Sequence, residues 1–269
     1  MLLVNLLTAF LKRDLKMRAP SKIGLLFDLL AVVFSATTFF FVSRLVPETS
    51  TSLNPYGGNY FAFVLVGLAF AQYQGHALSG MIGALQTEKE RGTLESLLVT
   101  PLSMTQFFLA STLWDFLYAT MNVVVYACAG VFIFGMKLHS QGLFWACITF
   151  VLAYSSFIGM GVLSAAFFLR FRRGNPGVWL IGEVSELLGG VYFPIALLPV
   201  FLRGMPAWLP MTHALESFRL ALLQGAGPSQ LWPHWIALSG FAVFFLGTGA
   251  WAMTSALRYA RRTGSLSHI

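Results

Sequence analysis

One short charged stretch, residues 87–101, separates two long apolar runs and constrains the fold more than any other feature of the sequence. It reads TEKERGTLESLLVTP and places five charges within eight residues, in a chain that is only 10% charged. The apolar runs on either side, residues 60–85 and 104–134, are long enough to cross a membrane. Because charged side chains are costly in hydrocarbon, the stretch must lie in water, as a loop or short helix between two membrane-spanning helices.

The composition indicates an integral membrane protein. The chain is 57% hydrophobic and its mean hydropathy is +0.73, well above the value expected of a soluble domain. A formal net charge of +7 would suit nucleic acid in a soluble protein, but membrane proteins concentrate Lys and Arg in their cytoplasmic loops. We therefore expect no nucleic-acid partner. Cys128 and Cys147 both fall inside apolar runs, and we expect no structural disulfide.

The hydropathy pattern predicts an all-α integral membrane fold with six transmembrane helices. A helix needs about 20 apolar residues to cross a hydrocarbon core about 30 Å thick. All six predicted spans belong to a single transmembrane domain at residues 23–269, and the charged stretch falls in a loop at residues 86–103. The spans are residues 24–46, 60–85, 104–134, 143–169, 177–192 and 234–257.

Residues 1–22 are predicted to form an amphipathic helix that lies in the membrane interface and does not cross it. Leu3, Leu7 and Phe10 belong to an apolar series at helical spacing, while Lys12 and Arg13 begin a basic side. The residue before a proline avoids the helical region. The proline at position 20 is therefore expected to end this helix.

The predicted fifth span is only weakly hydrophobic. On membrane-insertion scales, Glu183 and Glu186 offset most of the apolar contribution of residues 177–192. The two glutamates are three residues apart and share one helix face. We therefore expect other helices to enclose this one, with both glutamates facing inward. Gly189-Gly190 should weaken the helix before Pro194.

Residues 194–225 remain apolar but are broken by prolines. Neither apolar piece is long enough to span the bilayer. The pattern predicts re-entrant or interfacial half-helices, which are tolerated where protein or a wet cavity covers the backbone. In the second piece, Glu216 and Arg219 have the i, i+3 spacing of a helical ion pair.

Polar and small side chains mark one side of the second span and part of the third. Gln72 and His76 lie four residues apart on one helix face, which fits either hydrogen bonds between helices or a polar element of a substrate path. Asp115 should face a partner or water, because an acid near a helix centre costs roughly 2.5–3.5 kcal/mol on insertion. A stripe of small residues should let a neighbouring helix approach closely; its members are Gly67, Ala71, Gly75, Ser79 and Gly83.

The distribution of basic residues predicts the orientation. With six spans both termini share one side, and that side holds thirteen basic residues against four on the other. The cytoplasmic side of a membrane protein carries the excess of Lys and Arg, so both termini and the charged stretch are expected in the cytoplasm. The four residues on the opposite side are Arg44, Lys137, Arg203 and Arg219.

The sequence lacks the motifs that would make this chain an enzyme. It contains no G-x-x-x-x-G-K-[ST] phosphate cradle, no H-E-x-x-H, no C-x-x-C and no G-x-S-x-G. Its five histidines are scattered and suggest no metal site. We therefore expect no catalytic residue, metal or cofactor in this chain. Intramembrane acids can relay protons, which leaves a proton-coupled secondary transporter using Asp115, Glu183 and Glu186 as an alternative function.

Residues 88–101, EKERGTLESLLVTP, resemble the signature loop of ABC-2 type transporter permeases, the membrane subunits of bacterial ABC exporters. Three further features are similar to that family: the interfacial helix before the first span, GGVYFP at residues 189–194, and PMTHALESFR at residues 210–219. The chain departs from the family at two places. It has Gly-Gly where Ser-Gly is common before Phe-Pro, and it has Ser111 and Asp115 where a lysine is common early in the third span.

The resemblance implies a complex of two permease subunits, expected to be a homodimer, with two cytoplasmic ATPase subunits that bind ATP and Mg. It implies a bacterial inner-membrane protein surrounded by lipid, in which the charged loop is a coupling helix seated on the ATPase and the turn at 170–174 is a second contact. The implied coupling residues are Glu88, Lys89, Glu90, Arg91, Gly92, Thr93, Leu94, Glu95, Leu97, Leu98, Arg170, Arg172 and Arg173.

The resemblance also implies an export path between the two subunits and an outer gate made by residues 194–225. The expected substrate is hydrophobic or amphipathic, drug-like or lipid-like, and the alternative is a polysaccharide or lipid-linked glycan. We assign ten residues to the path or gate: Gln72, His76, Asp115, Glu183, Glu186, Tyr192, Phe193, Pro194, Glu216 and Arg219.

Overall fold

The computed structural model describes residues 8, 11–16, 21–46, 51–90, 92, 104–136, 139–171 and 176–262. Within these ranges the chain is helical and contains no strand. The α-helices, with their bounds, are α2 (Lys22–Ser43), α3 (Tyr60–Glu90), α5 (Met104–Cys128), α6 (Leu143–Phe171), α7 (Pro176–Leu188), α8 (Pro210–Gln224) and α9 (Pro228–Arg262). Shorter turns are η1 (Thr51–Tyr56), η2 (Ala129–Ile133), η3 (Ser140–Gly142), η4 (Ile195–Leu197) and η5 (Pro206–Trp208).

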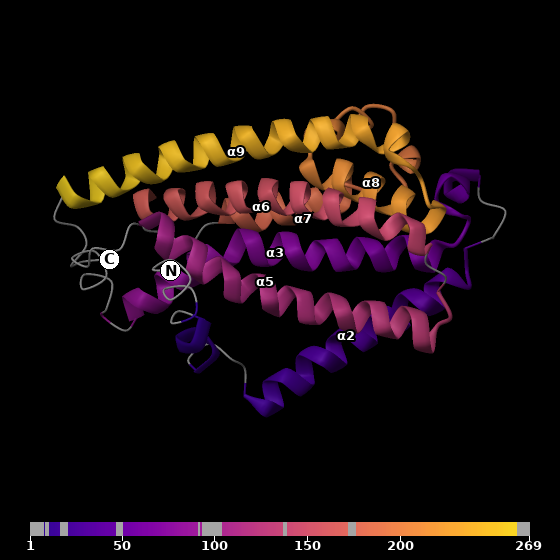
Figure 1. Ribbon diagram of the computed structural model, residues 1–269, viewed down its shortest axis with the longest axis horizontal. Helices are drawn as coiled ribbons and strands as arrows, with labels where there is room; N and C mark the ends of the chain where they lie inside the picture. The colour runs from indigo at the N-terminus through magenta and orange to yellow at the C-terminus, as the bar shows by residue number, and fades with distance from the viewer. Residues whose placement is uncertain are drawn as a thin grey trace.

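The long helices run roughly side by side along the length of the molecule, with α3 in the middle (Figure 1). In this view α6 and α9 lie above α3, and α5 and the inclined α2 lie below it. The most buried of the candidate spans is in α3, and the least buried is α2. The last turns of α3, α6 and α9 lie at one end of the molecule, which we call the loop end because α3 leads there into the charged loop. We call the other end, with η1 and α8, the gate end.

Five helices of the described chain are long and apolar enough to cross a membrane, against the six predicted from the sequence. They lie at Lys22–Ser43, Tyr60–Glu88, Ala110–Ile133, Ser140–Phe171 and Pro228–Tyr259. The predicted fifth span corresponds to α7, which has only 13 residues and therefore rises about 20 Å at 1.5 Å per residue. A sixth span thus stays a prediction.

α9 begins at Pro228 and contains Pro233, so the helix starts six residues before residue 234, the predicted start of the last span. Proline is well suited to the first helical position, where its missing N–H would have no partner in any case. Pro233 follows within two turns, so the N–H that it lacks costs only one bond near the start of the helix. The two prolines that indicated a break in the sequence instead lie within one helix.

Residues 194–225 contain one α-helix, where the sequence predicted two half-helices. The first apolar piece is a series of turns containing η4 and η5, and only the second piece is an α-helix, α8. Gly225 ends α8 with φ +65°, and its N–H bonds to the carbonyl of Ala221. This left-handed residue closes the helix as glycine commonly does. Re-entry of this region into the membrane stays a prediction.

Glycines let the central helices approach one another closely. A Cβ added at Gly161 of α6 would lie 2.0 Å from the carbonyl oxygen of Ala77 in α3, and one added at Gly159 would lie 2.6 Å from the backbone nitrogen of Leu246 in α9. No real Cβ tolerates such distances, so these positions require glycine. Close backbone approach at small residues is how membrane helices gain packing energy, and it fixes α3, α6 and α9 relative to one another.

Candidate functional site

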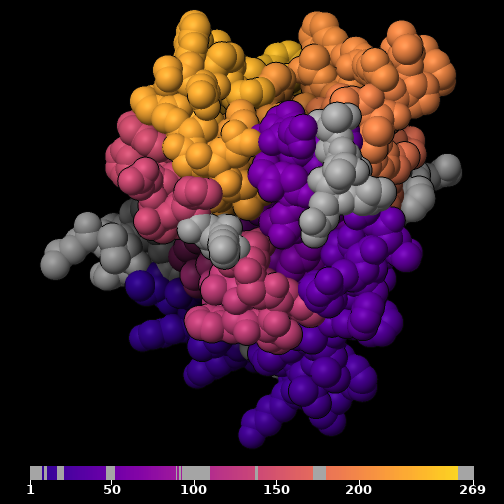
Figure 2. All heavy atoms as spheres, turned by 90° about the vertical axis from the view of Figure 1, so that its right-hand side faces the viewer, coloured from indigo at the N-terminus to yellow at the C-terminus, as the bar shows by residue number. Residues whose placement is uncertain are grey.

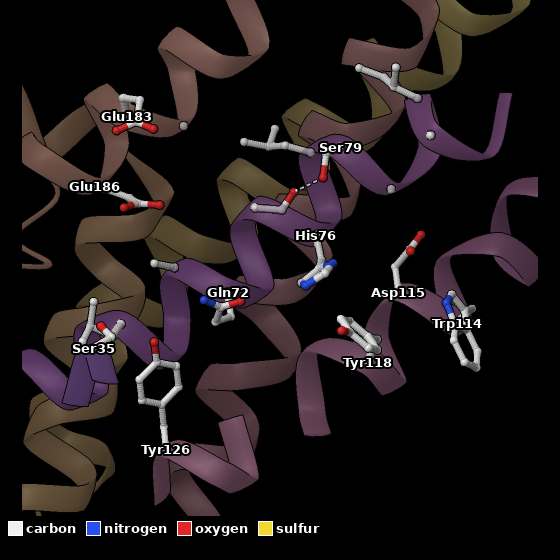
Figure 3. A pocket seen from close by; sticks show the side chains of 18 of the residues that line it. Ser35, Gln72, His76, Ser79, Trp114, Asp115, Tyr118, Tyr126, Glu183 and Glu186 are labelled. Atoms are coloured by element: carbon white, nitrogen blue, oxygen red, sulfur yellow. Dashed lines mark hydrogen bonds between the residues drawn. The ribbon is translucent and has the colours of Figure 1, made fainter. Parts of the chain in front are cut away.

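A groove of about 1050 Å³ lies between α2, α3, α5 and α7. Figure 3 shows polar side chains from these helices surrounding it, with Gln72 and His76 on α3, Asp115 on α5 and Glu183 on α7. Six of the ten residues that the sequence assigned to a path or gate line this groove: Gln72, His76, Asp115, Glu183, Glu186 and Tyr192. The structure therefore brings together residues from three separate predicted spans.

The small-residue stripe of α3 forms one wall of the groove. Ala71, Gly75, Ser79 and Gly83 all line it, and a Cβ added at Gly75 or Gly83 would meet no atom within 4 Å. The close helix contact predicted for the stripe is therefore wrong for these glycines within the described chain. Only Gly67 has such a contact, with the carbonyl oxygen of Val191 2.4 Å from an added Cβ. Small side chains elsewhere in the stripe leave the groove open.

Asp115 is buried, with 5% of its surface exposed, and lies against α3 at the edge of the groove. A Cβ added at Gly80 would come within 2.2 Å of its Oδ2 atom, so glycine at position 80 makes room for this carboxylate. The expectation that Asp115 faces a partner or water fits this placement, because the residue lines the groove. One turn later on α5, Tyr118 also lines the groove and donates a hydrogen bond to Asp28 of α2.

The two glutamates of α7 face the groove, but α7 is less enclosed than predicted. Tyr192 donates a 2.7 Å hydrogen bond from its hydroxyl to Oε2 of Glu186. Glu183 lies one turn earlier on the same lining. Four large apolar residues of α7 are exposed, namely Leu180, Ile181, Val184 and Leu187. The sequence correctly placed the acids toward polar surroundings, but the helices of this chain leave part of α7 uncovered.

Three aromatic side chains of the groove, all on α5, escaped the sequence prediction, which named only Tyr192 among the groove's aromatic residues. Trp114, Tyr118 and Tyr126 of α5 all line it, together with Ser35 of α2 and Gln86 of α3. The signal was available in part, because Tyr118 is one helical turn from Asp115 and Tyr126 lies two turns further along the same face. In a chain with 15% aromatic residues, such spacing alone did not separate these side chains from lipid-facing ones.

Arg219 lies outside the groove and organises the gate end of the molecule. Only 1% of its surface is exposed. It donates to the carbonyl of Phe63 from Nε at 3.1 Å and Nη2 at 2.9 Å, to Gly190 at 2.8 Å and to Val191 at 3.2 Å. Its guanidinium carbon also lies 3.4 Å from the centroid of the Phe63 ring. Arg219 therefore joins α8 to α3 and to the segment that follows α7.

The predicted ion pair between Glu216 and Arg219 does not form within the described residues. Glu216 instead accepts a 2.5 Å hydrogen bond from the hydroxyl of Tyr56 in η1. Burial, together with the nearby Glu216 carboxylate, raises the pKa of Tyr56 above its ordinary value. The carbonyls of Phe63, Gly190 and Val191 accept the hydrogen bonds of the Arg219 guanidinium in place of the carboxylate. Figure 2 looks onto this end, where orange segments around residues 190–220 lie against violet ones around residues 51–65.

Tyr192 connects the groove to the gate end, where the remaining predicted residues lie. Its carbonyl accepts a 3.0 Å hydrogen bond from the hydroxyl of Tyr60 at the start of α3. Phe193 follows it and is partly buried, and Pro194 is buried and caps η4. Neither Phe193 nor Pro194 lines the groove. Four of the ten predicted residues therefore belong to the gate end: these two with Glu216 and Arg219.

At the loop end, Glu88 has a partner inside the chain. α3 continues through the predicted loop start as far as Glu90, and Glu88 is buried there beside the helical segment 11–16. Its Oε1 atom lies 2.9 Å from Nη1 of Arg13, and Arg13 also lies 3.0 Å from Oδ1 of Asp14. Lys89 lies in the last turn of α3, where Glu90 is exposed, and Gly92 adopts φ +67°.

Most of the predicted coupling surface lies outside the described residues. This applies to Arg91, Thr93, Leu94, Glu95, Leu97 and Leu98 in the loop and to Arg172 and Arg173 in the basic turn. Arg170 is described, and its guanidinium carbon lies 3.6 Å from the centroid of the Tyr259 ring. Arg170 thus contacts α9 of the same chain.

Comparison with known proteins matches most of the chain to one family. A family model described as ABC-2 type transporter matches residues 5–223. The chain is 26% identical over 146 residues to the probable multidrug ABC transporter permease YbhR of Escherichia coli strain K12, which covers 54% of this chain and 39% of that protein. It is 25% identical over 174 residues to the probable multidrug ABC transporter permease YbhS of the same strain, covering 62% and 46%. The chain therefore spans less than half the length of these curated relatives.

Proposed function

Because the chain belongs to the ABC-2 type transporter family, whose members are the membrane-spanning subunits of transporters, we propose that it is the permease subunit of an ATP-driven exporter. In this proposal two copies of the chain form a homodimer and work with two separate ATPase subunits, which bind ATP and Mg. The groove between α2, α3, α5 and α7 is each copy's half of the translocation path. The observation that carries the proposal is this groove, about 1050 Å³ in volume and lined by polar and aromatic side chains in a multi-pass membrane protein.

A second copy would cover surfaces that a single chain leaves open beside the groove. The exposed side of α7 carries Leu180, Ile181, Val184 and Leu187, and α2 is the least buried of the candidate spans. An exposed glutamate, Glu183, lies on α7 next to this apolar side. An acid facing lipid is costly, whereas the same acid facing a wet path between two protomers is not. The charge of α7 therefore favours the paired arrangement.

The groove lining favours an amphipathic substrate that carries a positive charge. Among the described residues that line it are three carboxylates, Asp115, Glu183 and Glu186, and no Lys or Arg. Trp114 and three tyrosines add aromatic surface, on which a cation is attracted by the ring quadrupole. In a chain of net charge +7, this acidic lining is a local exception. A drug-like or lipid-like amphiphile fits it better than a polysaccharide, which would need mostly hydrogen-bonding walls.

The proposed membrane arrangement keeps six spans and places both termini in the cytoplasm. α7 and the turn at residues 189–194 would together make the fifth crossing in chain order, which brings the number of crossings from five to six. α8 would dip into the outer leaflet as a re-entrant helix. The ends of α3, α6 and α9 lie at one end of the molecule (Figure 1), which carries the excess of basic residues. The positive-inside rule then places the loop end in the cytoplasm of the bacterial cell, where the ATPase subunits act on it.

Coupling is proposed to run from the ATPase through the loop at 86–103 into α3. Leu94, Leu97 and Leu98 would supply an apolar anchor, and charges such as Glu95 would form salt bridges with the ATPase. Because α3 is continuous from the loop to the groove, movement of the loop end would be transmitted to the residues of the groove. Glu95→Arg should abolish transport and uncouple ATP hydrolysis while membrane insertion stays intact. Normal export by a well-expressed Glu95→Arg protein would contradict the assignment.

The function is tested by export of a fluorescent cationic dye into inverted membrane vesicles that contain the chain and its ATPase. We expect uptake to require ATP and to fall at least tenfold in a Glu183→Gln/Glu186→Gln protein, with a smaller effect on a neutral dye of similar size. Vesicles with a hydrolysis-deficient ATPase provide the control. Uptake that needs no ATPase but stops when the proton gradient is dissipated would instead establish the proton-coupled alternative.

A further inference from the structure

A second cavity, distinct from the groove, lies between the last turns of α6 and α9. Its volume is about 310 Å³, and its described lining consists of Arg170 from α6 with Trp251, Ser255, Arg258 and Tyr259 from α9. The lining contains two arginines and three side chains with an N–H or O–H donor, and it includes no carboxylate. A pocket with this chemistry is suited to an oxyanion.

The two arginines are held in place by contacts within the chain. The Arg170 guanidinium carbon lies 3.6 Å from the centroid of the Tyr259 ring, and Nε of Arg258 lies 3.4 Å from the carbonyl oxygen of Thr254. Stacking of a guanidinium on an aromatic face leaves the N–H groups at its edge available to a ligand. Both side chains are exposed at this surface. They therefore present donors to a ligand from positions that are already ordered.

The distance between the two arginines is set by the close packing of their helices. A Cβ added at Gly249 of α9 would lie 2.9 Å from the carbonyl oxygen of Gly159 in α6, and one added at Gly159 would lie 2.6 Å from the backbone of Leu246. The backbones are in contact along this stretch, so α6 and α9 act as one unit. Binding of a ligand between Arg170 and Arg258 would therefore cause little further loss of conformational entropy, because the two helices are already fixed relative to each other.

The order of residues along α9 at this cavity is typical of the boundary between lipid tails and headgroups. Trp251 is 72% exposed and precedes Arg258 by seven residues, which corresponds to about 10 Å along a helix. Before it, Val243 and Phe244 form an exposed apolar surface. Tryptophan is enriched at membrane interfaces, and basic pockets between helices on the cytoplasmic side bind lipid headgroups. Trp251 is therefore expected near the lipid acyl chains and Arg258 near the phosphates.

We propose that this cavity binds the phosphate of an anionic phospholipid between Arg170 and Arg258. Ser255 lies within the same cavity and donates a hydrogen bond to the phosphate or glycerol oxygens, and one acyl chain runs past Trp251. The proposal requires that the chain spans a membrane with its loop end near the headgroups, and it does not depend on which substrate is exported. It assigns Arg170 to lipid, where the family resemblance of the sequence implied an ATPase contact.

The test titrates the full-length protein in detergent with phosphatidylglycerol and follows retained lipid by native mass spectrometry. Phosphatidylcholine, which has the same glycerol and acyl chains but no net charge, is the reference lipid. We expect phosphatidylglycerol to bind more tightly, and Arg170→Gln/Arg258→Gln to weaken it by at least about tenfold, because both guanidinium hydrogen bonds to the phosphate are lost. Lys22→Gln removes one exposed positive charge from α2 and should leave the affinity within twofold.

Ser255→Trp keeps both arginines and the net charge but fills the cavity, so it should also lower the phosphatidylglycerol affinity at least tenfold.

Three results would overturn the proposal. The first is equal binding of both lipids by the unmodified protein, and the second is an equal loss in the Lys22 variant. The third is displacement of the lipid by millimolar inorganic phosphate, which would make the cavity a free-anion site. If an arginine variant still binds lipid but no longer binds the ATPase, the result would also contradict the proposal and support a role for Arg170 in the ATPase contact.

Discussion

Arg13 and Glu88 form an ion pair, with Nη1 of Arg13 2.9 Å from Oε1 of Glu88, and this pair ties the N-terminal helical segment to the last turns of α3. Glu88 is almost fully covered and Arg13 is partly covered. The charged stretch is therefore anchored inside the permease at its beginning. Any force that reaches α3 from the loop also reaches the segment at 11–16, which the sequence predicts to lie in the membrane interface.

Glu88→Ala should destabilise the protein by roughly 1–3 kcal/mol, between the values for exposed and buried pairs, because Arg13 would be left partly buried without this partner. Thermal unfolding in detergent measures the effect. Glu90→Ala, which removes an exposed carboxylate two residues away on the same helix, is the matched control and should change stability by less than about 0.5 kcal/mol. An equal loss in both variants would mean that the ion pair adds nothing.

Gly161→Ala should disrupt the contact between α3 and α6, since its Cβ would lie 2.0 Å from the carbonyl oxygen of Ala77. Backbone cannot move aside as a flexible side chain can, so we expect a loss of at least about 2 kcal/mol, as for other overpacked sites. Gly75→Ala adds the same atom where nothing lies within 4 Å. It should stabilise α3 by up to about 1 kcal/mol through helix propensity. Thermal unfolding of the two proteins in the same detergent tests both signs, and a stable Gly161→Ala protein would contradict this packing.

Arg219→Gln should prevent stable folding of the gate end. It removes the hydrogen bonds to Phe63, Gly190 and Val191 at once, and each buried carbonyl left unsatisfied costs about 1–3 kcal/mol. Arg219→Lys keeps the charge but has no planar fork and should recover little. Arg44→Gln, an exposed arginine after α2, is the control. If Arg219→Gln unfolded at the same temperature as the control, the proposed role of these bonds would be wrong.

Tyr56→Phe should change how stability depends on alkaline pH. The pKa of Tyr56 is raised in the folded protein, so its contribution is fully present below the ordinary tyrosine pKa of about 10. Above that pH the unfolded chain ionises while the folded chain stays neutral, so the stabilisation declines. The stability difference between unmodified and Tyr56→Phe protein should therefore be constant from pH 7 to 9 and shrink above pH 10. A constant difference up to pH 11 would show that Tyr56 is not buried against Glu216.

Periodicity and charge in the sequence account for much of the candidate site. Gln72, His76, Asp115, Glu183 and Glu186 were identified because polar groups in membrane-length helices need a reason to be there, and all five line one groove. Arg219 shows the limit of this reasoning. Its spacing from Glu216 predicted an ion pair, but its partners are carbonyls of residues up to 156 positions away, and local spacing carries no information about them.

The amino-acid sequence is sufficient to identify a helical membrane protein, the loop that carries the family signature, and the polar residues within its spans. Those properties follow from local hydropathy and charge, which act residue by residue along the chain. Three other features are visible only in the folded protein: glycines of α3 open onto a groove, Glu88 is paired with Arg13, and Arg170 stacks on α9. Each of these depends on which helix lies beside which, and that is set by packing between residues far apart in the chain.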